Sequence, residues 1–362
     1  MRKTSLVSLT LILAAVACTK TEAPAGPLSV PLATAPSFAN RAAAVNRTLL
    51  DGFNAHDAQK LASAYAADAT ATSYGASEYR GRAAIAEHIA AFFKAYPDAK
   101  ASIARTWRGN DVDVLEWVVT GRSLGDVGPT KLGMTPVDFV GASVFIAPLN
   151  ANKRPVGFVG ASVLWLDSNG LIAQEHAYSD SNTPLLQLDR ADGDARPIAT
   201  LPASAEVHAA RESADEAKNL ELHKTMYTLA GDKKPEPFAF LADDLVLEDY
   251  GDPDARKPVS GLGAKRRWLP TPEGKRDVLS STAVEDFTLV EETLHRSVAN
   301  KLFTIHGLDV IEWKGGKAIK AWTYSNSKEF YDQLLPRMPT NAEKPAAGPT
   351  APKPDKAAPA KN

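Results

Sequence analysis

A phrase repeated near the end of each half of the chain is the strongest constraint on the fold. Residues 170–188 align with residues 316–334 without a gap, and six of the nineteen positions are then identical. LEWVVTGR at 115–122 also resembles EETLHRS at 291–297 when Glu116 is set on Glu291. The sequence therefore predicts a duplicated folding unit, and 362 residues suit two domains of roughly 150 residues each.

The N-terminus has the pattern of an export signal. Arg2 and Lys3 precede an apolar run of about eleven residues, too short to cross a bilayer at about 20 residues per helix. The small residues before Cys18, the one cysteine of the chain, resemble a bacterial lipobox. We therefore expect residues 1–17 to be a signal peptide and Cys18 to carry lipid.

Two fates of the exported chain stay open. By resemblance to bacterial sorting rules, Thr19 after the cysteine favours an outer-membrane lipoprotein that faces the periplasm. The sequence Ala15-Val16-Ala17 also fits ordinary signal peptidase, which would leave a soluble periplasmic or secreted protein. In either case a single cysteine forms no internal disulfide, so stability must come from packed cores.

Proline-rich stretches mark the borders of the globular parts. We predict a flexible tether at 18–37, a first domain at 38–190, a linker at 191–204, a second, divergent domain at 205–336 and a disordered tail at 337–362. A net charge of −2 and a pI near 6.4 give no electrostatic case for nucleic acid as a partner.

Each half begins with helical periodicity and ends in strands. The first half has helical spacing through Val45, Leu49 and Phe53 and again at 82–96, followed by strands near 100–107, 112–122, 137–147, 156–166 and 171–179. The second half predicts helices at roughly 206–230 and 235–242, then strands at 244–250, 277–284, 286–297, 302–313 and 317–325. This order is typical of an α+β fold with helices packed on one face of a curved antiparallel sheet.

The segments at 53–98, 114–125 and 171–180 resemble the nuclear transport factor 2-like superfamily, and within it the SnoaL-like polyketide cyclase group. FLADDLVLEDY, VEETLHRS and KAIKAWTYSN carry a weaker version in the second half. The resemblance implies two tandem cone-shaped domains, each with a pocket between the concave side of its sheet and its helices. Members of the superfamily include cyclases, isomerases and binding domains without activity, so the fold alone does not decide the function.

The last strand of the first half holds the candidate catalytic residues. Side chains two apart share a face of a strand, so His176, Tyr178 and Asp180 should point one way, together with Gln174. In SnoaL-like cyclases an Asp near this position is the implied acid/base. The resemblance therefore implies that Asp180 abstracts a proton alpha to a carbonyl, while His176 or Tyr178 holds the enolate.

A second interpretation of Asp180 needs no catalysis. The second half has Asn326 at the equivalent position, and both residues precede a predicted helix. Asp and Asn are both good helix N-caps, and their exchange there costs little free energy. The sequence therefore leaves open whether Asp180 is an acid/base or a cap.

Other polar and aromatic side chains are candidates for binding rather than catalysis. The candidate ligand-binding residues are Gln174, Trp117, His88, Trp322, Tyr324 and Asn326. The seven histidines are scattered without metal-ligand spacing, and no phosphate-binding glycine loop is present, so we expect no metal and no cofactor.

Together these patterns favour an envelope lipoprotein whose two domains pack as a pseudo-dimer and bind a small apolar molecule or a protein partner without catalysis. The alternative is a lyase or isomerase of the polyketide-cyclase type that uses Asp180.

Overall fold

The computed structural model describes the chain between Ser37 and Leu334, in residues 37–75, 77–123, 136–139, 142–145, 154–188, 195–231, 239–251, 257–268, 275–298 and 301–334. The predicted signal peptide, Cys18, nearly all of the tether and the C-terminal tail lie outside these residues. We call elements α1 to β9 the first half and elements α5 to α7 the second half.

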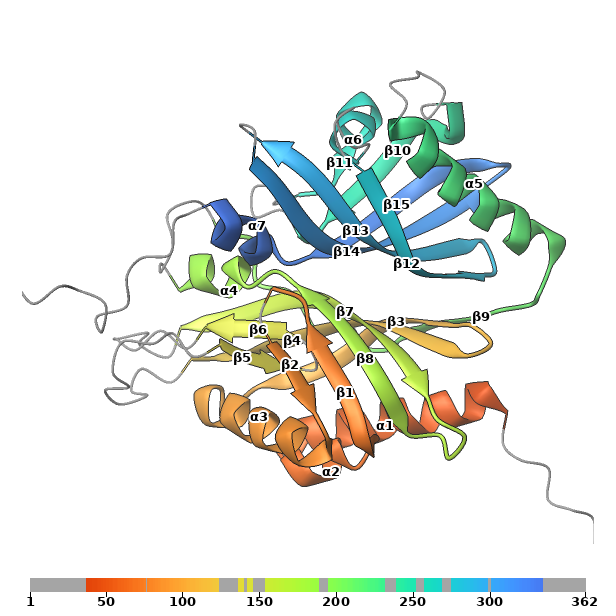
Figure 1. Ribbon diagram of the computed structural model, residues 1–362. Helices are drawn as coiled ribbons and strands as arrows, with labels where there is room; N and C mark the ends of the chain where they lie inside the picture. Colours follow the sequence, from red (N-terminus) through yellow and green to blue (C-terminus); the bar gives the residue numbers. More distant parts are fainter. Residues whose placement is uncertain are drawn as a thin grey trace, which may run out of the picture. The chain divides into compact units, whose positions relative to one another are not determined.

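The first half is built on a seven-stranded sheet (Figure 1). Its order is β2-β1-β8-β7-β4-β3-β9. The strands are β1 (Tyr65–Ser73), β2 (Ser77–Arg80), β3 (Lys100–Arg108), β4 (Val112–Arg122), β7 (Pro155–Leu166), β8 (Ile172–Ser179) and β9 (Glu206–Ala209). The sheet is mainly antiparallel, but β1 runs parallel to β8 and β3 runs parallel to β9.

Three helices cover one face of this sheet: α1 (Phe38–Asn54), α2 (Ala58–Ala62) and α3 (Arg82–Ala95) (Figure 1). Ser37 and Asp57 cap the first two, because each side chain accepts a hydrogen bond from a backbone N–H three residues on. Apolar side chains of α1 and α3, such as Phe53 and Phe92, share a core with Trp117 of β4. A small ribbon of β5 (Pro136–Phe139) and β6 (Ala142–Phe145) and the short helix α4 (Asn182–Gln187) complete the half.

The second half repeats this plan with a six-stranded sheet of order β11-β10-β15-β14-β13-β12. Its strands are β10 (Leu241–Asp249), β11 (Val259–Ser260), β12 (Lys275–Val284), β13 (Phe287–Val298), β14 (Lys301–Lys314) and β15 (Lys317–Ser325). Its helices are α5 (Ala214–Gly231), α6 (Gly261–Trp268) and α7 (Ser327–Leu334). Apolar side chains of α5, such as Met226, pack with Leu245 of β10 and Ile311 of β14.

The two sheets agree in detail as well as in order. The β1–β8 and β10–β15 pairs are both parallel and both shift register partway along. The β3–β4 pair has an irregularity before Arg105, which lies opposite Glu116, and the β12–β13 pair has one before Ser280, which lies opposite Glu291. The predicted α+β class with two domains of this kind is therefore confirmed.

One predicted element is wrong at its start. The helix expected from about residue 206 begins at Ala214, and residues 206–209 instead form β9 on the edge of the first sheet. Val207 is half exposed on that edge strand, so its apolar character reflects strand pairing rather than a helix face.

The faces opposite the helices share a further core. Along β4, Leu115 and Trp117 pack toward the helices, whereas Val112 and Val114 point the other way because side chains alternate along a strand. The core on this other side contains residues of both sheets: Trp107, Val112, Val114, Ala161, Val163, Tyr178, Val284, Leu289, Leu308, Val310, Trp322 and Tyr324.

Candidate functional site

The candidate residues of β8 lie in the contact between the two sheets. As the alternation predicts, Gln174, His176 and Tyr178 share one face of the strand, but this face meets the second half instead of the helices. The residues that face the helices are the alternate set, including the buried Glu175. His176 and Tyr178 therefore point away from the helices, toward the second half.

His176 and Tyr178 converge on a carboxylate that the sequence did not single out as a site residue. Glu291 of β13 is 1% exposed, and its Oε1 accepts a hydrogen bond of 2.7 Å from the Tyr178 hydroxyl and lies 2.9 Å from His176 Nδ1. The Ser280 hydroxyl donates to Oε2 at 2.5 Å. Burial and the nearby Glu291 charge raise the pKa of Tyr178 well above its ordinary value, so its hydroxyl stays a donor.

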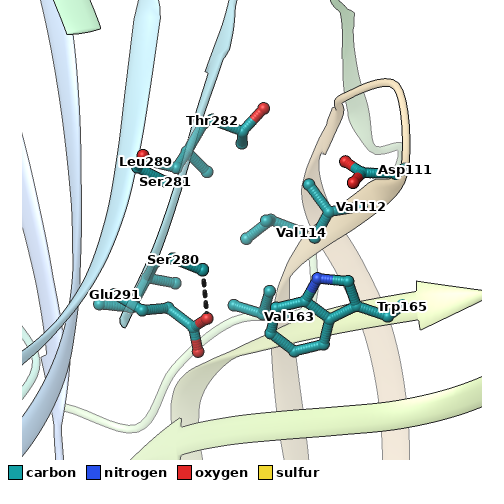
Figure 2. Close-up of a pocket in the computed structure, with 11 residues that line it drawn as sticks. Asp111, Val112, Val114, Val163, Trp165, Ser280, Ser281, Thr282, Leu289 and Glu291 are labelled. Carbon is teal, nitrogen blue, oxygen red and sulfur yellow. Dashed lines mark hydrogen bonds between the residues drawn. The ribbon is translucent and has the colours of Figure 1, made fainter. Parts of the chain in front are cut away.

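A cavity of about 120 Å³ borders Glu291 (Figure 2). Its walls come from both halves: Asp111, Val112, Val114, Val163 and Trp165 from the first, and Ser280, Ser281, Thr282, Leu289, Glu291 and Leu308 from the second. Its walls are partly apolar, but most of the surface that faces the cavity is polar and includes two carboxylates, and no Lys, Arg or His side chain is among these lining residues. The cavity can hold a small group that offers hydrogen-bond donors to a carboxylate and packs its apolar part against valine and leucine side chains.

The equivalent glutamate of the first half has a different partner. One Nη of Arg105 lies 2.9 Å from each oxygen of Glu116, and the Tyr324 hydroxyl donates a hydrogen bond to Glu116 Oε2. The Arg105 guanidinium also lies 4.9 Å from the centre of the Trp322 ring. Burial raises the pKa of Glu116 and the Arg105 charge lowers it, so the ion pair offsets part of the cost of burial.

Asp180 sits in the turn after β8 and is 3% exposed. Its carboxylate accepts hydrogen bonds from the Thr183 hydroxyl at 2.7 Å, the Asn182 backbone N–H at 3.2 Å and the Ser327 hydroxyl at 2.5 Å. Burial raises its pKa. This side chain does not line the cavity beside Glu291 or the one beside His88, and the geometry is that of a turn cap that also contacts the second half.

Asn326 has the matching position after β15. Its side-chain oxygen accepts hydrogen bonds from the backbone N–H of Lys328 and Ser181, and its amide donates to the Tyr74 carbonyl and the Ser181 hydroxyl. Both members of the Asp/Asn pair therefore hold a local turn and reach across to the other half.

A cavity of about 10 Å³ lies between the first sheet and its helices, roughly room for one water molecule, next to His88, Tyr79 and Glu175. A larger one, of about 260 Å³, borders Leu50 of α1 and Ile103 of β3. The His88 ring stacks on Tyr79 with centroids 4.2 Å apart, and burial lowers its pKa to about 4. Glu175 accepts a 2.6 Å hydrogen bond from the Tyr65 hydroxyl, and burial raises its pKa.

The remaining predicted binding residues are divided between the two regions. Trp117 lies on the helix side and donates a hydrogen bond of 3.1 Å to the Ser162 hydroxyl. Trp322 and Tyr324 lie in the core shared by the two sheets. Gln174 Nε2 lies 2.7 Å from His176 Nε2, so it orients that ring.

The second half buries a polar network under α5 that the sequence did not reveal. One Nη of Arg276 contacts both oxygens of Glu292 at 2.6 Å and Asp309 at 3.0 Å, and the Tyr227 hydroxyl donates to Asp309 at 2.6 Å. His223 lies 2.9 Å from that hydroxyl, and burial lowers its pKa to about 3. These residues are on four separate elements, so no local spacing could have indicated the network. None of them lines the cavity beside Glu291.

The described residues hold neither a candidate metal cluster nor a candidate membrane-spanning helix. No group of three or more His, Cys, Asp or Glu side chains is arranged there to hold a metal ion. No helix in the same part of the chain has the length and apolarity needed to cross a bilayer.

Comparison with known proteins finds a family likeness in the first half. Residues 46–175, just over a third of the chain, match the family model described as a SnoaL-like domain. This segment is therefore similar to a SnoaL-like domain. No curated protein matches the sequence.

Solved structures show distant likeness in fold. A candidate polyketide cyclase from Xanthomonas campestris pv. campestris is 17% identical with a TM-score of 0.34, covering 42% of this chain and 99% of the other. TsrD from Streptomyces laurentii is 15% identical with a TM-score of 0.33, covering 42% and 97%. An epoxide hydrolase of M. tuberculosis, described as LEH-like, is 16% identical with a TM-score of 0.29, covering 33% and 92%.

Proposed function

We propose that this protein is a binding protein without catalytic activity, in which two SnoaL-like domains form an internal pseudo-dimer. The single observation that carries the proposal is the site at Glu291. There two of the three predicted catalytic side chains, His176 and Tyr178, hydrogen-bond to a carboxylate of the other half, beside a cavity lined by residues of both halves.

The common plan of the two halves supports a duplicated origin. The strand orders match, and the irregularities before Arg105 and Ser280 occur at equivalent points. The contacts across the join are reciprocal, because Tyr178 donates to Glu291 and its equivalent Tyr324 donates to Glu116. Such reciprocity is what a two-fold symmetric dimer becomes when its subunits are fused in one chain.

The alternative, proton abstraction by Asp180, has less support. An acid/base must reach its substrate directly or through one water molecule. Asp180 is instead enclosed by three donors, and it lines neither the cavity beside Glu291 nor the one beside His88.

The proposal also includes export and attachment to the outer membrane through lipid on Cys18. It rests on the sequence pattern at residues 1–18. In this arrangement the binding domains face the periplasm.

Native mass spectrometry of protein purified from its own envelope fraction tests these proposals together. We expect an acylated N-terminal cysteine and a non-covalent small molecule released on denaturation. The control is Cys18→Ser, which should lose the acyl mass and leave the membrane fraction while keeping the small molecule. An unacylated N-terminus would contradict the lipoprotein assignment. A turnover activity abolished by Asp180→Asn would contradict the non-catalytic assignment.

A further inference from the structure

We propose that the cavity beside Glu291 binds a small organic cation, a guanidinium group on a short alkyl chain, which takes the place that Arg105 has beside Glu116. This inference rests on the proposed binding function and specifies the ligand class. The cavity is small, about 120 Å³, so it suits a head group of a few heavy atoms rather than a polycyclic molecule.

The internal duplication provides the comparison. Arg105 lies opposite Glu116 in the β3–β4 pair, immediately after the irregularity, and Ser280 lies opposite Glu291 at the same point of the β12–β13 pair. Each glutamate also accepts a hydrogen bond from the tyrosine that begins the repeated Tyr-Ser-Asp/Asn motif of the other half. Tyr324 donates to Glu116, and Tyr178 donates to Glu291. Two residues before the tyrosine, His176 contacts Glu291, whereas Trp322 contacts Arg105. The other difference between the two sites is the residue opposite the glutamate.

That difference removes a cation and opens space. The guanidinium of Arg105 pairs with Glu116, whereas the short Ser280 side chain gives Glu291 only a hydroxyl donor. Ser280 and Glu291 both line the cavity, which extends over Val163 and Val114 (Figure 2). A guanidinium entering from the cavity would restore the pair that the first half makes within the chain.

The charges around the cavity favour a cation. Glu291 is almost fully buried, and its one basic partner among the described residues is His176, whose Nδ1 lies 2.9 Å from the carboxylate. Asp111 adds a second carboxylate at an exposed position of the lining. Burying a carboxylate costs free energy unless a cation and hydrogen bonds compensate its charge. A cation bound beside Glu291 would therefore be stabilised by this buried charge.

The walls suit the rest of such a ligand. Trp165 offers an indole ring, which attracts guanidinium groups through cation–π contact. Val112, Val114 and Leu289 can pack against a short alkyl chain. Shape and charge together select a compact cation over an anion or a neutral polar molecule.

Isothermal titration calorimetry with methylguanidinium tests the proposal on the mature full chain. We expect saturable binding of one equivalent. The neutral analogue methylurea, of nearly the same shape, should bind at least about tenfold more weakly, because it lacks the charge-assisted hydrogen bonds. Equal binding of the two, or no binding of methylguanidinium, would overturn the proposal without any variant.

Three variants locate the site. Glu291→Gln should weaken methylguanidinium binding by at least about tenfold, and Ser280→Arg should abolish it because the new side chain occupies the cavity. Asp111→Asn, at an exposed position where folding is not at stake, should weaken binding by a smaller factor. Unchanged affinity in the folded Glu291→Gln and Asp111→Asn proteins would contradict this site.

The outcome separates the ligand class from the binding function. If the native protein releases a neutral small molecule and ignores methylguanidinium, the cation proposal fails and the binding function stands. If the native protein carries no small molecule and binds neither probe, both fail.

Discussion

At the scale of the residue, the exchange of Asp180 for Asn326 between the halves shows what the turn after the last strand requires. Both side chains accept hydrogen bonds from backbone N–H groups nearby and contact residues of the other half. The requirement is for a short polar side chain with an acceptor oxygen, and a negative charge is not part of it.

Asp180→Asn should therefore lower the free energy of unfolding by less than about 1 kcal/mol. In the wild-type protein the Thr183 and Ser327 hydroxyls donate to the Asp180 carboxylate. A hydroxyl can also accept a hydrogen bond, so the amide group of the new asparagine can donate to one of them. Asp180→Ala is the matched control and should cost about 1–3 kcal/mol, since buried donors lose their partner. Urea unfolding measures both. Equal losses in the two variants would mean that the charge itself is needed.

His88 should make stability depend on pH. Burial lowers its folded pKa to about 4, while an unfolded histidine titrates near 6.5. The folded state thus binds the proton less well than the unfolded state. The contribution of neutral His88 to the free energy of unfolding is therefore complete above pH 6.5 and is lost as the pH falls toward 4. His88→Phe keeps a ring to stack on Tyr79 but cannot be protonated. Between pH 7 and 4.5 the free energy of unfolding of this variant should therefore fall by up to about 2 kcal/mol less than that of the wild-type protein.

Urea titrations of both proteins at several pH values measure this difference. The wild-type and His88→Phe proteins should both keep the acid-side loss caused by His223, whose pKa burial lowers to about 3. Parallel pH profiles of the two proteins would contradict the assignment to His88.

At the scale of the element, the sequence predicted the strands and the shared face of His176 and Tyr178, but not which way that face points. The alternation along β8 cannot decide this, because Glu175 on one side and Tyr178 on the other are both buried. A strand with one solvated face would have shown the direction through its polar residues. The role of Glu291 as a site residue could not be predicted for another reason. Its partner Tyr178 is 113 residues away in the chain, so no local pattern links the two.

Two equivalent glycines on the β7 and β14 strands give a matched test of packing. A Cβ on Gly160 would lie 2.3 Å from the Trp117 ring and 2.9 Å from the Tyr178 carbonyl oxygen. On Gly307 the nearest atom would be the Tyr324 carbonyl oxygen at 3.5 Å, because Glu292 replaces the tryptophan there. Gly160→Ala should therefore cost about 1–3 kcal/mol through overpacking.

Gly307→Ala should be neutral or stabilise the protein by up to about 1 kcal/mol, since alanine restricts the unfolded chain. Urea unfolding of the two variants side by side measures the contrast. Similar costs at both positions would show that the strand backbone, and not the tryptophan, sets the need for glycine.

At the scale of the whole molecule, the two halves share a buried core and a set of reciprocal hydrogen bonds. Trp107 and Val163 of the first half pack in one cluster with Leu308 and Trp322 of the second. Separating the halves would expose this apolar surface to water and would leave Glu116 without its tyrosine donor. The halves should therefore stabilise one another and unfold together.

Scanning calorimetry of the full chain should accordingly show one cooperative transition, with equal calorimetric and van't Hoff enthalpies. Tyr324→Phe removes a hydroxyl between the halves and should cost about 1–3 kcal/mol by leaving a buried carboxylate short of a donor. Because each half stabilises the other, the variant should move the single unfolding transition to lower temperature without splitting it into two. Hydrogen exchange should then speed up in β4 and in β15 alike. Two resolved transitions, with only one moved by Tyr324→Phe, would instead mean that each sheet is held together by its own helix-side core.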